Sequence, residues 1–245
     1  YNEYGESLSE RTFFNHKKAI YDTFDIELKC DRSLGYYISN DDDVQSDALK
    51  NWMLQSLSLN NIMNEGSDLR DRIICEDVPS SQKWLPEIMA AMRDGKKLEM
   101  TYQSFWKTEA HTYAVAPYCL KLFKQRWYML AKSDAYEHPR IYALDRIHHL
   151  TQTKLGYKLP KGFDPKETFR KLFGVIMDNG PVENVVIRVS DDQVKYYRTL
   201  PLHHSQVEVE RNEEFSIFEY RLCPTFDFQQ KLLSMGDSAG VLAPV

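Results

Sequence analysis

The chain has 245 residues, of which 42% are hydrophobic and 27% charged, and its formal net charge at pH 7 is -5. This length suits two or three small domains, and no apolar run approaches the roughly 20 residues that a membrane helix needs. The cysteines form no CxxC pair, which argues against a zinc ribbon or a disulfide scaffold and fits a reducing cytoplasm. They are Cys30, Cys75, Cys119 and Cys223.

The charge is unevenly distributed along the chain. Residues 96–154 carry five more Lys and Arg than Asp and Glu, whereas residues 41–95 carry six fewer and residues 183–245 carry four fewer. A local basic excess suggests an anionic ligand for residues 96–154. Chance clustering of a few charges is the alternative.

Residues 7–24 are predicted to form a helix, because Ser7 followed by Glu10 fits a capping box. The turn sequence DRSLG (31–35) lies between two β-prone runs and predicts a hairpin. A helix followed at once by a hairpin is the back half of a winged helix-turn-helix. Since the chain begins with Tyr1 rather than Met, we expect a longer protein with two preceding helices. The apolar residues at helical spacing that should face a core are Phe13, Ile20 and Phe24.

One face of the predicted helix is polar, with Arg11, Asn15, Lys18 and Asp22 at helical spacing. Arginine can pair with guanine, asparagine with adenine, and lysine can neutralise phosphate. On spacing alone, a plain solvated face is favoured, and the net charge of -2 over residues 1–40 is poor for DNA binding. The hairpin that follows favours DNA binding. The candidate DNA-binding residues are Arg11, Thr12, Asn15, His16 and Lys18.

Residues 41–95 are predicted to be a helical linker that begins with an acidic stretch. Helices are expected at 47–64 and at 83–94, with Gly95 placed to end the second. The residues of the second helix that should share one apolar face are Leu85, Ile88, Met89 and Met92.

Five short strands are predicted within residues 96–154, and this number in so short a stretch suggests a small β-barrel. In the third strand, alternate side chains point to opposite faces. Trp127, Met129 and Ala131 form an apolar face, and the other face carries two cations and a phenol, with Leu130 among them. The predicted strands cover 97–105, 111–123, 126–133, 140–147 and 149–153.

The last part of the chain is predicted to be a separate module. Residues 155–182 contain Gly, Pro and a short helix, and we interpret them as a linker. Residues 183–245 then follow the order strand, helix, strand, strand, helix, strand. This βαββαβ order is typical of a ferredoxin-like fold.

Three stretches resemble one family of bacterial regulators. RWYMLA followed by RIYALDRI resembles the signature of the WYL domain, named for Trp-Tyr-Leu, with Met129 in the third place. The upstream runs KLEMTYQSF and APYCLKLF fit it as well. The DNA-binding end of these regulators is similar to the stretch SERTFFNHKKAIYDTFDIELKCDRSLGYYI. The extension that often follows a WYL domain is similar to residues 183–245. The likeness covers nearly the whole chain.

The resemblance implies a cytoplasmic, usually dimeric, DNA-binding transcriptional regulator. Its WYL domain is expected to be an Sm-like barrel that senses an anionic ligand, such as a nucleotide or single-stranded nucleic acid. The expected fold class is multi-domain α+β. Its parts are a partial winged helix-turn-helix (1–40), a helical linker (41–95), an Sm-like WYL barrel (96–154), a linker (155–182) and a ferredoxin-like extension (183–245).

A cluster of cations and phenols in the barrel is the predicted ligand site, because arginine grips phosphate or carboxylate and tyrosine offers a ring for stacking. Alternatively, Arg140 or Arg146 forms a structural ion pair with Asp145 or Glu137, and the tyrosines belong to the core. Tyr102, like Trp127, is expected in the core. The candidate ligand-binding residues are Tyr118, Lys121, Arg126, Tyr128, Arg140, Tyr142 and Arg146.

An enzyme is the rival class. The sequence has no H-E-x-x-H, G-x-S-x-G or P-loop pattern, and the pairs His148–His149 and His203–His204 each point opposite ways in a strand. We therefore expect no catalytic residues, metal site or cofactor. A metal-dependent hydrolase stays as a weak alternative, and an Sm-like RNA- or nucleotide-binding protein without operator binding as a further one. The expected partners are duplex DNA, an anionic effector and a second copy of the chain, with no membrane.

Overall fold

The structure is a computed structural model. In it the chain forms two compact units, Tyr1–Glu76 and Asp77–Val245. Each unit is described by itself. The helix predicted at 47–64 lies outside the described residues. The structure describes residues 9–24, 26–31, 33, 35–39, 81–178 and 180–244.

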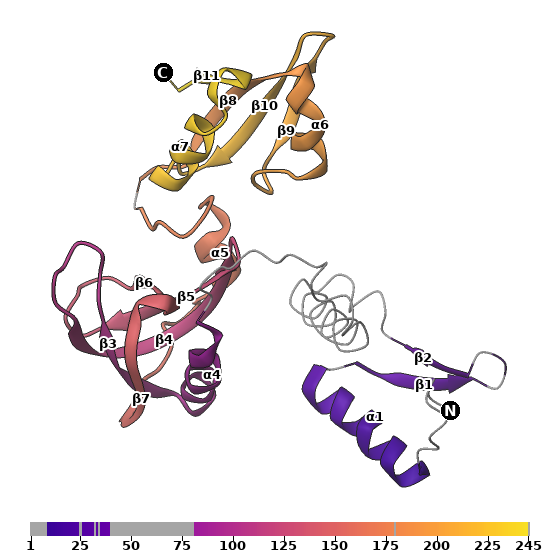
Figure 1. The fold of residues 1–245 in the computed structure, drawn as a ribbon, viewed down its shortest axis with the longest axis vertical. Helices are drawn as coiled ribbons and strands as arrows, with labels where there is room; N and C mark the ends of the chain where they lie inside the picture. The colour runs from indigo at the N-terminus through magenta and orange to yellow at the C-terminus, as the bar shows by residue number, and fades with distance from the viewer. Residues whose placement is uncertain are drawn as a thin grey trace, which may run out of the picture. The chain divides into compact units, whose positions relative to one another are not determined.

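The first unit contains the predicted helix and hairpin (Figure 1). Gly35 opens the second strand with a φ of 77°, a left-handed conformation that glycine adopts without strain. The helix is capped by Ser9, whose Oγ accepts a hydrogen bond from the amide of Thr12 (3.1 Å). The predicted capping residue, Ser7, lies outside the described residues. The elements are α1 (Glu10–Phe24), β1 (Leu28–Asp31) and β2 (Gly35–Ile38).

Helix α1 is held against the hairpin by aromatic contact. The rings of Phe13 and Tyr36 lie 4.6 Å apart, and Phe13 and Ile20 are half-buried as their spacing predicted. The side chain of Phe24 is not among those described. The predicted polar stripe is exposed along its length, as both a solvated face and a DNA-binding face require: Arg11, Asn15, Lys18 and Asp22.

The second unit opens with η2 (Gln82–Trp84) and α4 (Leu85–Asp94), which together match the helix predicted at 83–94. Gly95 ends α4 in a left-handed conformation, as predicted. The buried face is centred on Ile88 and Ala91. Met89 was expected in this face, but it is 53% exposed, because it lies one residue and about 100° around the helix from Ile88.

Five antiparallel strands form what we call the central sheet, in the order β6-β5-β4-β3-β7. All five predicted strands are present, and α4 lies against β3, β4 and β7 (Figure 1). The bounds are β3 (Lys96–Tyr102), β4 (His111–Phe123), β5 (Arg126–Ser133), β6 (Arg140–Ala143) and β7 (Ile147–Gly156).

The central sheet is curled, but it is not a closed barrel. Only the turn η3 (Leu144–Arg146) joins β6 to β7, so the two edge strands are within about 14 Å of each other there. The edges of a flat five-stranded sheet would lie about 19 Å apart. Among the described strands, no ladder joins β6 to β7. The predicted closure is therefore wrong, and assignment to the Sm-like fold stays a prediction.

The turn η3 also corrects the strand predicted at 140–147. Alternation in RIYALDRI suggested one strand with Arg140, Tyr142, Leu144 and Arg146 on one face. The strand ends at Ala143 and η3 follows, so Arg146 is presented by a turn and Leu144 is fully buried. Period-two alternation continues by chance through the turn, which hides the end of the strand.

The apolar face of β5 lies in the core, as predicted. Trp127 is 8% exposed, and Met129 and Ala131 are fully buried. Leu130, on the other face, is buried as well, whereas Arg126 and Tyr128 are half-buried. The polar face of β5 is therefore covered in its middle and partly open at its start.

Residues 183–244 form the C-terminal module, a four-stranded antiparallel sheet in the order β11-β8-β10-β9. Its core joins one face of the sheet to side chains from α6 and α7, such as Val194, Tyr197 and Phe228. The ferredoxin-like assignment stays a prediction. The elements are β8 (Glu183–Ser190), α6 (Asp191–Thr199), β9 (Val207–Arg211), β10 (Phe215–Leu222), α7 (Phe226–Leu233), η4 (Gly236–Ser238) and β11 (Ala239–Ala243).

The segment after α5 (Pro165–Arg170) connects the central sheet to the C-terminal module. On one side, the ammonium of Lys121 donates to the carbonyl of Gly174 (2.6 Å). On the other, the ring of Phe173 meets that of Phe228 (5.4 Å). Gly174 is buried, and a Cβ there would collide with the carboxylate of Asp227. Glycine at this position allows the close approach.

Candidate functional site

The predicted DNA-binding residues lie on α1 in the first unit. Arg11, Asn15, His16 and Lys18 are exposed. Thr12 is half-buried, and its hydroxyl is hydrogen-bonded to that of Ser9 (2.7 Å) at the helix start. The structure therefore leaves four of the five candidates open to a ligand, and Thr12 serves the helix end.

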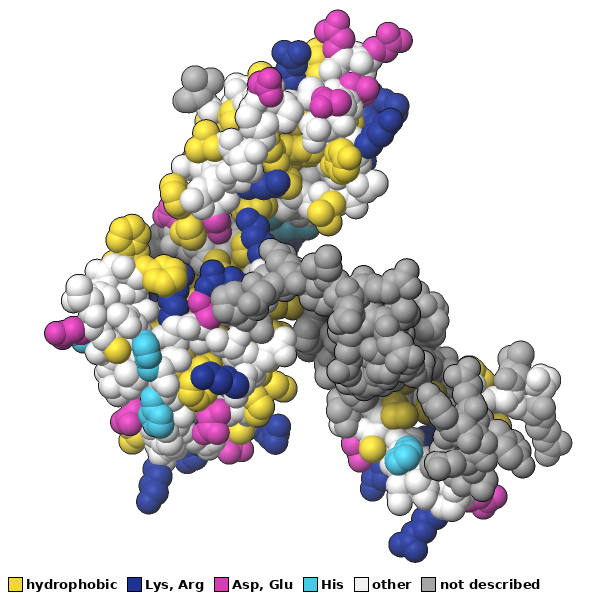
Figure 2. Space-filling model, viewed as in Figure 1, with side chains coloured by type: hydrophobic (Ala, Val, Ile, Leu, Met, Phe, Trp, Pro, Cys, Tyr) yellow, Lys and Arg dark blue, Asp and Glu magenta, His cyan; other side chains and the backbone are white. Residues whose placement is uncertain are grey.

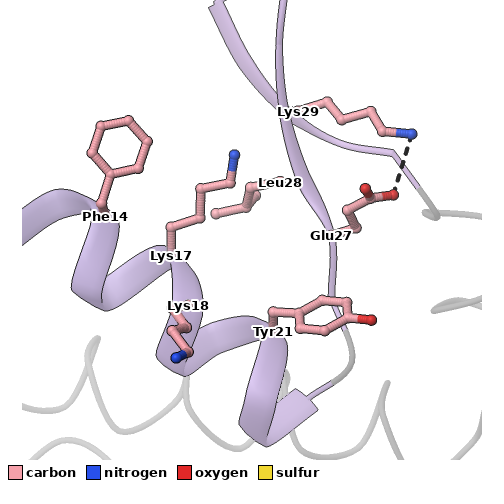
Figure 3. Close-up of a pocket in the computed structure, with 7 residues that line it drawn as sticks. All are labelled: Phe14, Lys17, Lys18, Tyr21, Glu27, Leu28 and Lys29. Carbon is pink, nitrogen blue, oxygen red and sulfur yellow. Dashed lines mark ion pairs between the residues drawn. The ribbon is translucent and has the colours of Figure 1, made fainter.

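A hollow of about 660 Å³ lies between α1 and β1 and is basic and aromatic (Figure 3). Phe14 and Tyr21 are 55% and 52% exposed. Lys29 forms an ion pair with Glu27 (3.2 Å), the one carboxylate in the lining. A hydrogen bond from Ser39 and the contact with Lys29 hold the pKa of Glu27 below its ordinary value. The lining residues are Phe14, Lys17, Lys18, Tyr21, Glu27, Leu28 and Lys29.

A second cavity, which we call the aromatic–arginine pocket, lies in the central sheet and has a volume of about 220 Å³. It is formed by the end of β3, the β3–β4 connection, β4, the β5–β6 connection, β6 and η3. Its lining residues are Tyr102, Ser104, Trp106, Lys107, Tyr113, Tyr136, Arg140, Ile141, Tyr142 and Arg146.

Two buried tyrosines line its inner wall. The rings of Tyr102 and Tyr142 meet edge to face, with centroids 5.1 Å apart. The amide of Ala143 donates to the Tyr102 hydroxyl (3.4 Å). The Tyr142 hydroxyl is buried and has no hydrogen-bond partner within the described part of the chain. Burial raises the pKa of Tyr142 to about 12, so its phenol stays protonated and can donate a hydrogen bond at neutral pH.

A second pair of tyrosines lies beside Arg140. The hydroxyls of Tyr136 and Tyr113 are hydrogen-bonded to each other (3.1 Å), and this contact is the main cause that raises the pKa of Tyr113 to about 12. The guanidinium of Arg140 stacks on the ring of Tyr136, 3.5 Å from its centroid. Stacking occupies the face of the guanidinium and leaves the N–H groups on its edge able to bind a carboxylate or phosphate.

Arg146 is positioned in the same way by the β3–β4 connection. Its guanidinium lies 3.6 Å from the centroid of the Phe105 ring, and its buried Nε has no hydrogen-bond partner among the described residues. Trp106, next to Phe105, is 96% exposed. The pocket thus combines an orphaned donor with an exposed indole at its rim.

The lining of the aromatic–arginine pocket is cationic. It contains two arginines and Lys107, and none of its ten residues is an Asp or Glu. Asp145 lies next to Arg146 in the chain, but its carboxylate forms an ion pair with Arg126. A buried donor without a partner is costly, and like charges without compensation repel each other. A bound anion would accept a hydrogen bond from the donor and would compensate the positive charges.

The seven predicted ligand residues therefore do not all lie together. Three of them, Arg140, Tyr142 and Arg146, line the pocket. Arg126 is paired with Asp145, an ion pair of the structural kind that the sequence had suggested for Arg140 or Arg146. Tyr128 lies beside Lys121 across β4 and β5.

The remaining two predicted residues face the segment that leads to the C-terminal module. Tyr118 lies 5.3 Å from Phe163, measured between ring centroids. Lys121 lies over the ring of Phe169 (4.3 Å) besides its hydrogen bond to Gly174, and burial lowers its pKa. Both side chains are engaged in packing and take no part in the pocket.

Several lining residues were not predicted. Tyr102 is buried as expected, yet its ring also lines the pocket. Tyr113 and Tyr136 were missed, because their contact joins β4 to a loop 23 residues later. A signal was available for Trp106 and Lys107, since aromatic and basic residues side by side in a strand connection are typical of nucleic-acid-binding surfaces.

Two features are absent from the described residues. No three His, Cys, Asp or Glu side chains are grouped so that they could hold a metal ion. None of the helices in the described parts is long and apolar enough to span a membrane.

Comparison with solved structures shows distant similarities. Proteasome accessory factor B/C (PafBC) of Arthrobacter aurescens is 18% identical, with a TM-score of 0.38 over 98% of this chain and 40% of that one. A CRISPR Cas-related protein is 13% identical, with a TM-score of 0.45 over 67% of this chain and 48% of that one. The chain spans less than half of either protein. Superpositions this loose bear no weight on function.

Comparison with curated proteins gave no significant match. Residues 83–152, however, match the family model described as the WYL domain. They contain α4, the strands β3 to β6, part of β7, and every residue that lines the aromatic–arginine pocket. The resemblance noted in RWYMLA and RIYALDRI is thus confirmed, and residues 83–152 form a WYL domain.

Proposed function

We propose that this protein is a DNA-binding transcriptional regulator whose WYL domain binds an anionic, phosphate-bearing ligand in the aromatic–arginine pocket. The first unit contacts duplex DNA through α1 and the hairpin, and the ligand sets the output. The protein acts as a homodimer in the cytoplasm. The observation that carries this proposal is a pocket with three cations and no carboxylate in its lining. Two buried polar atoms there, on Tyr142 and Arg146, have no hydrogen-bond partner among the described residues.

The volume of the pocket limits what it can hold. At about 220 Å³, it is smaller than the 300–1,000 Å³ typical of sites that enclose a drug-sized ligand. It suits one phosphate group with part of its nucleotide, while the remainder stays outside. The exposed indole of Trp106 lies at the rim, where a base could stack on it. These features favour a nucleotide or a segment of single-stranded nucleic acid.

A fluorescence titration tests the ligand site. Oligothymidylate and mononucleotides are added to the whole chain while tryptophan emission is followed, and Trp106→Phe identifies the reporting residue. Arg140→Ala and Arg146→Ala should each weaken binding by about tenfold or more, because each removes a charge-assisted contact worth about 1.5–3 kcal/mol.

Arg188→Ala provides the matched control, because Arg188 also stacks on an aromatic ring, that of Phe215 (4.5 Å), in the C-terminal module. It should bind like the parent chain. Equal weakening by all three substitutions would show a general loss of charge and would rule out the pocket.

DNA binding is tested with the complete protein and a library of duplex fragments. Anisotropy should show affinity that falls steeply with salt, as counterion release requires. Arg11→Ala should weaken binding and relax sequence preference if Arg11 contacts a base. Arg93→Ala removes an exposed arginine of α4 instead and should have no effect. Absence of duplex binding at low salt would contradict this part of the proposal.

A further inference from the structure

A third cavity lies where α5 meets the C-terminal module, outside the residues that match the WYL model. We call it the junction pocket. Its volume is about 400 Å³, and it receives side chains from α5, from the residue before β8, from the α6–β9 connection and from β10. Its lining residues are Glu167, Arg170, Lys171, Val182, His204, Ser205 and Arg221.

The charge of the lining is positive. Arg170, Lys171 and Arg221 face a single carboxylate, Glu167, which lies 3.1 Å from the Arg170 guanidinium. His204 adds a side chain that can donate a hydrogen bond. Two formal cations are therefore left without a carboxylate within the lining.

The positive charge of the junction pocket contrasts with the net negative charge of the C-terminal module around it. Residues 183–245 carry four more Asp and Glu than Lys and Arg. In the view of Figure 2, acidic side chains lie at the end of the module away from α5, together with some Lys and Arg, and further Lys and Arg side chains lie near α5. A cationic hollow in an acidic module attracts a small anion rather than a long polyanion, because the surrounding charge repels an extended one.

The cations are exposed, but hydrogen bonds fix the backbone that carries them. The amide of Cys223 donates to the carbonyl of Lys171 (2.8 Å). A ring nitrogen of buried His203 contacts the carbonyl of Arg170 (2.9 Å). The amide of Arg221 donates to the hydroxyl of Ser205 (2.9 Å). Three chain segments are thus held together around the hollow, which lowers the entropic cost of binding there.

We infer that the junction pocket binds a small phosphate anion, of the size of pyrophosphate or the phosphate tail of a nucleotide. Arg170 and Arg221 are the residues that would grip phosphate oxygens, since guanidinium groups match their geometry. Lys171 and His204 add charge and a donor. The inference does not depend on the proposed ligand of the WYL domain, because none of these residues lines the aromatic–arginine pocket.

Such a ligand would link two parts of the second unit. Arg170 and Lys171 belong to the end of α5, whereas His204 and Arg221 belong to the C-terminal module. Binding to the folded junction alone must stabilise it by mass action. We therefore expect the anion to raise the melting temperature of the second unit.

Isothermal titration calorimetry on the whole chain, at constant ionic strength, tests the inference with pyrophosphate, ADP and ATP. Lys171→Ala and Arg221→Ala should each raise the Kd for pyrophosphate by about tenfold, equivalent to about 1.4 kcal/mol. Arg221→Lys keeps the charge and should recover part of the loss. Tighter binding of ADP than of pyrophosphate would identify a nucleotide, and equal binding a free phosphate; both outcomes support the site.

The matched controls are Lys195→Ala on α6 and Arg211→Ala on β9, which remove exposed cations of the same module outside the junction pocket. They should leave the Kd unchanged. Melting curves without ligand show whether each variant is folded. The inference is overturned if pyrophosphate at about 1 mM, which is enough to detect a weak phosphate site, gives no binding heat. It is also overturned if the control substitutions weaken binding as much as Arg221→Ala does. Arg140→Ala changes only the aromatic–arginine pocket and should leave the Kd for pyrophosphate unchanged. The two proposals can therefore fail independently of each other.

Discussion

Three arginines of the central sheet and its turn η3 fall into two groups that differ in what compensates their charge. Arg126 forms an ion pair with Asp145, whose side chain is 11% exposed. Arg140 and Arg146 lie instead on the rings of Tyr136 and Phe105, in a pocket whose lining has no carboxylate. An aromatic face orients a guanidinium without neutralising it. The first arrangement holds the fold together, and the second leaves charge available for a ligand.

This difference separates residues that look alike in the sequence. Arg126 and Arg140 both begin strands that are rich in aromatic residues, and both were predicted to bind the ligand. The distinction depends on the turn η3, which places Asp145 next to Arg126 and directs Arg146 into the pocket. The compensating group, rather than the residue type, therefore indicates which arginines serve a ligand.

The largest effect should come from the core that carries both groups. Trp127→Ala should lower the free energy of unfolding by roughly 3–5 kcal/mol, because it leaves a cavity beneath β5. Trp106→Ala is the matched control and should change stability by about 0.5 kcal/mol or less, since Trp106 is 96% exposed. Denaturant melts followed by circular dichroism check both. A similar loss in both variants would contradict the assignment of Trp106 to the pocket rim.

Much of this fold could be predicted because it depends on local pattern. The five strands, the hairpin and the end of α4 at Gly95 follow from alternation, turn residues and helical spacing. The site was predicted only in part. The partner of Arg126 is 19 residues away, and the pocket needs Tyr113, Tyr136 and the β3–β4 connection to meet. Contacts between distant segments leave no periodic signal in one sequence.

His203 is a buried titratable group, and each of its two ring nitrogens has a hydrogen-bond partner. The carbonyl of Arg170 can only accept, so Nε2 carries the proton, and Nδ1 faces the hydroxyl of Ser205 (2.7 Å). Burial, and next the neighbouring His204, lower the pKa of His203 from its ordinary 6.5 to about 4. The folded state thus disfavours the charged imidazolium.

The sign of the pH dependence follows from that direction. Because the folded pKa is depressed and the group is a base, the stabilisation is complete above pH 6.5 and is lost as the pH falls towards 4. The loss should reach up to about 3 kcal/mol. His203→Gln should flatten the melting temperature of the second unit over this range. An unchanged pH profile in the variant would show that other groups cause the acid sensitivity.

Arg126→Ala tests the structural half of the comparison. The substitution leaves the carboxylate of Asp145 without its cation, at a cost of about 1–3 kcal/mol. A fully buried pair would cost more, but the Arg126 side chain is 29% exposed. The pair is also incompletely hydrogen-bonded, because Arg126 Nε and Asp145 Oδ1 have no partner among the described residues. A double-mutant cycle with Asp145→Asn should give a clear coupling energy, and ligand affinity should change little. Zero coupling together with lost ligand binding would move Arg126 to the other group.

The smallest effect is the most specific, because it concerns one oxygen atom in each of two adjacent phenols. Tyr102→Phe removes a hydroxyl that accepts a hydrogen bond from Ala143 and should cost about 0.5–1.5 kcal/mol. The Tyr142 hydroxyl has no partner in the described part of the chain, so Tyr142→Phe should leave the unliganded fold unchanged or slightly more stable. If that hydroxyl serves a ligand, the same substitution should weaken oligothymidylate binding. Stability and affinity would then change independently in Tyr142→Phe, whereas a loss of stability equal to that of Tyr102→Phe would show that Tyr142 is a structural residue.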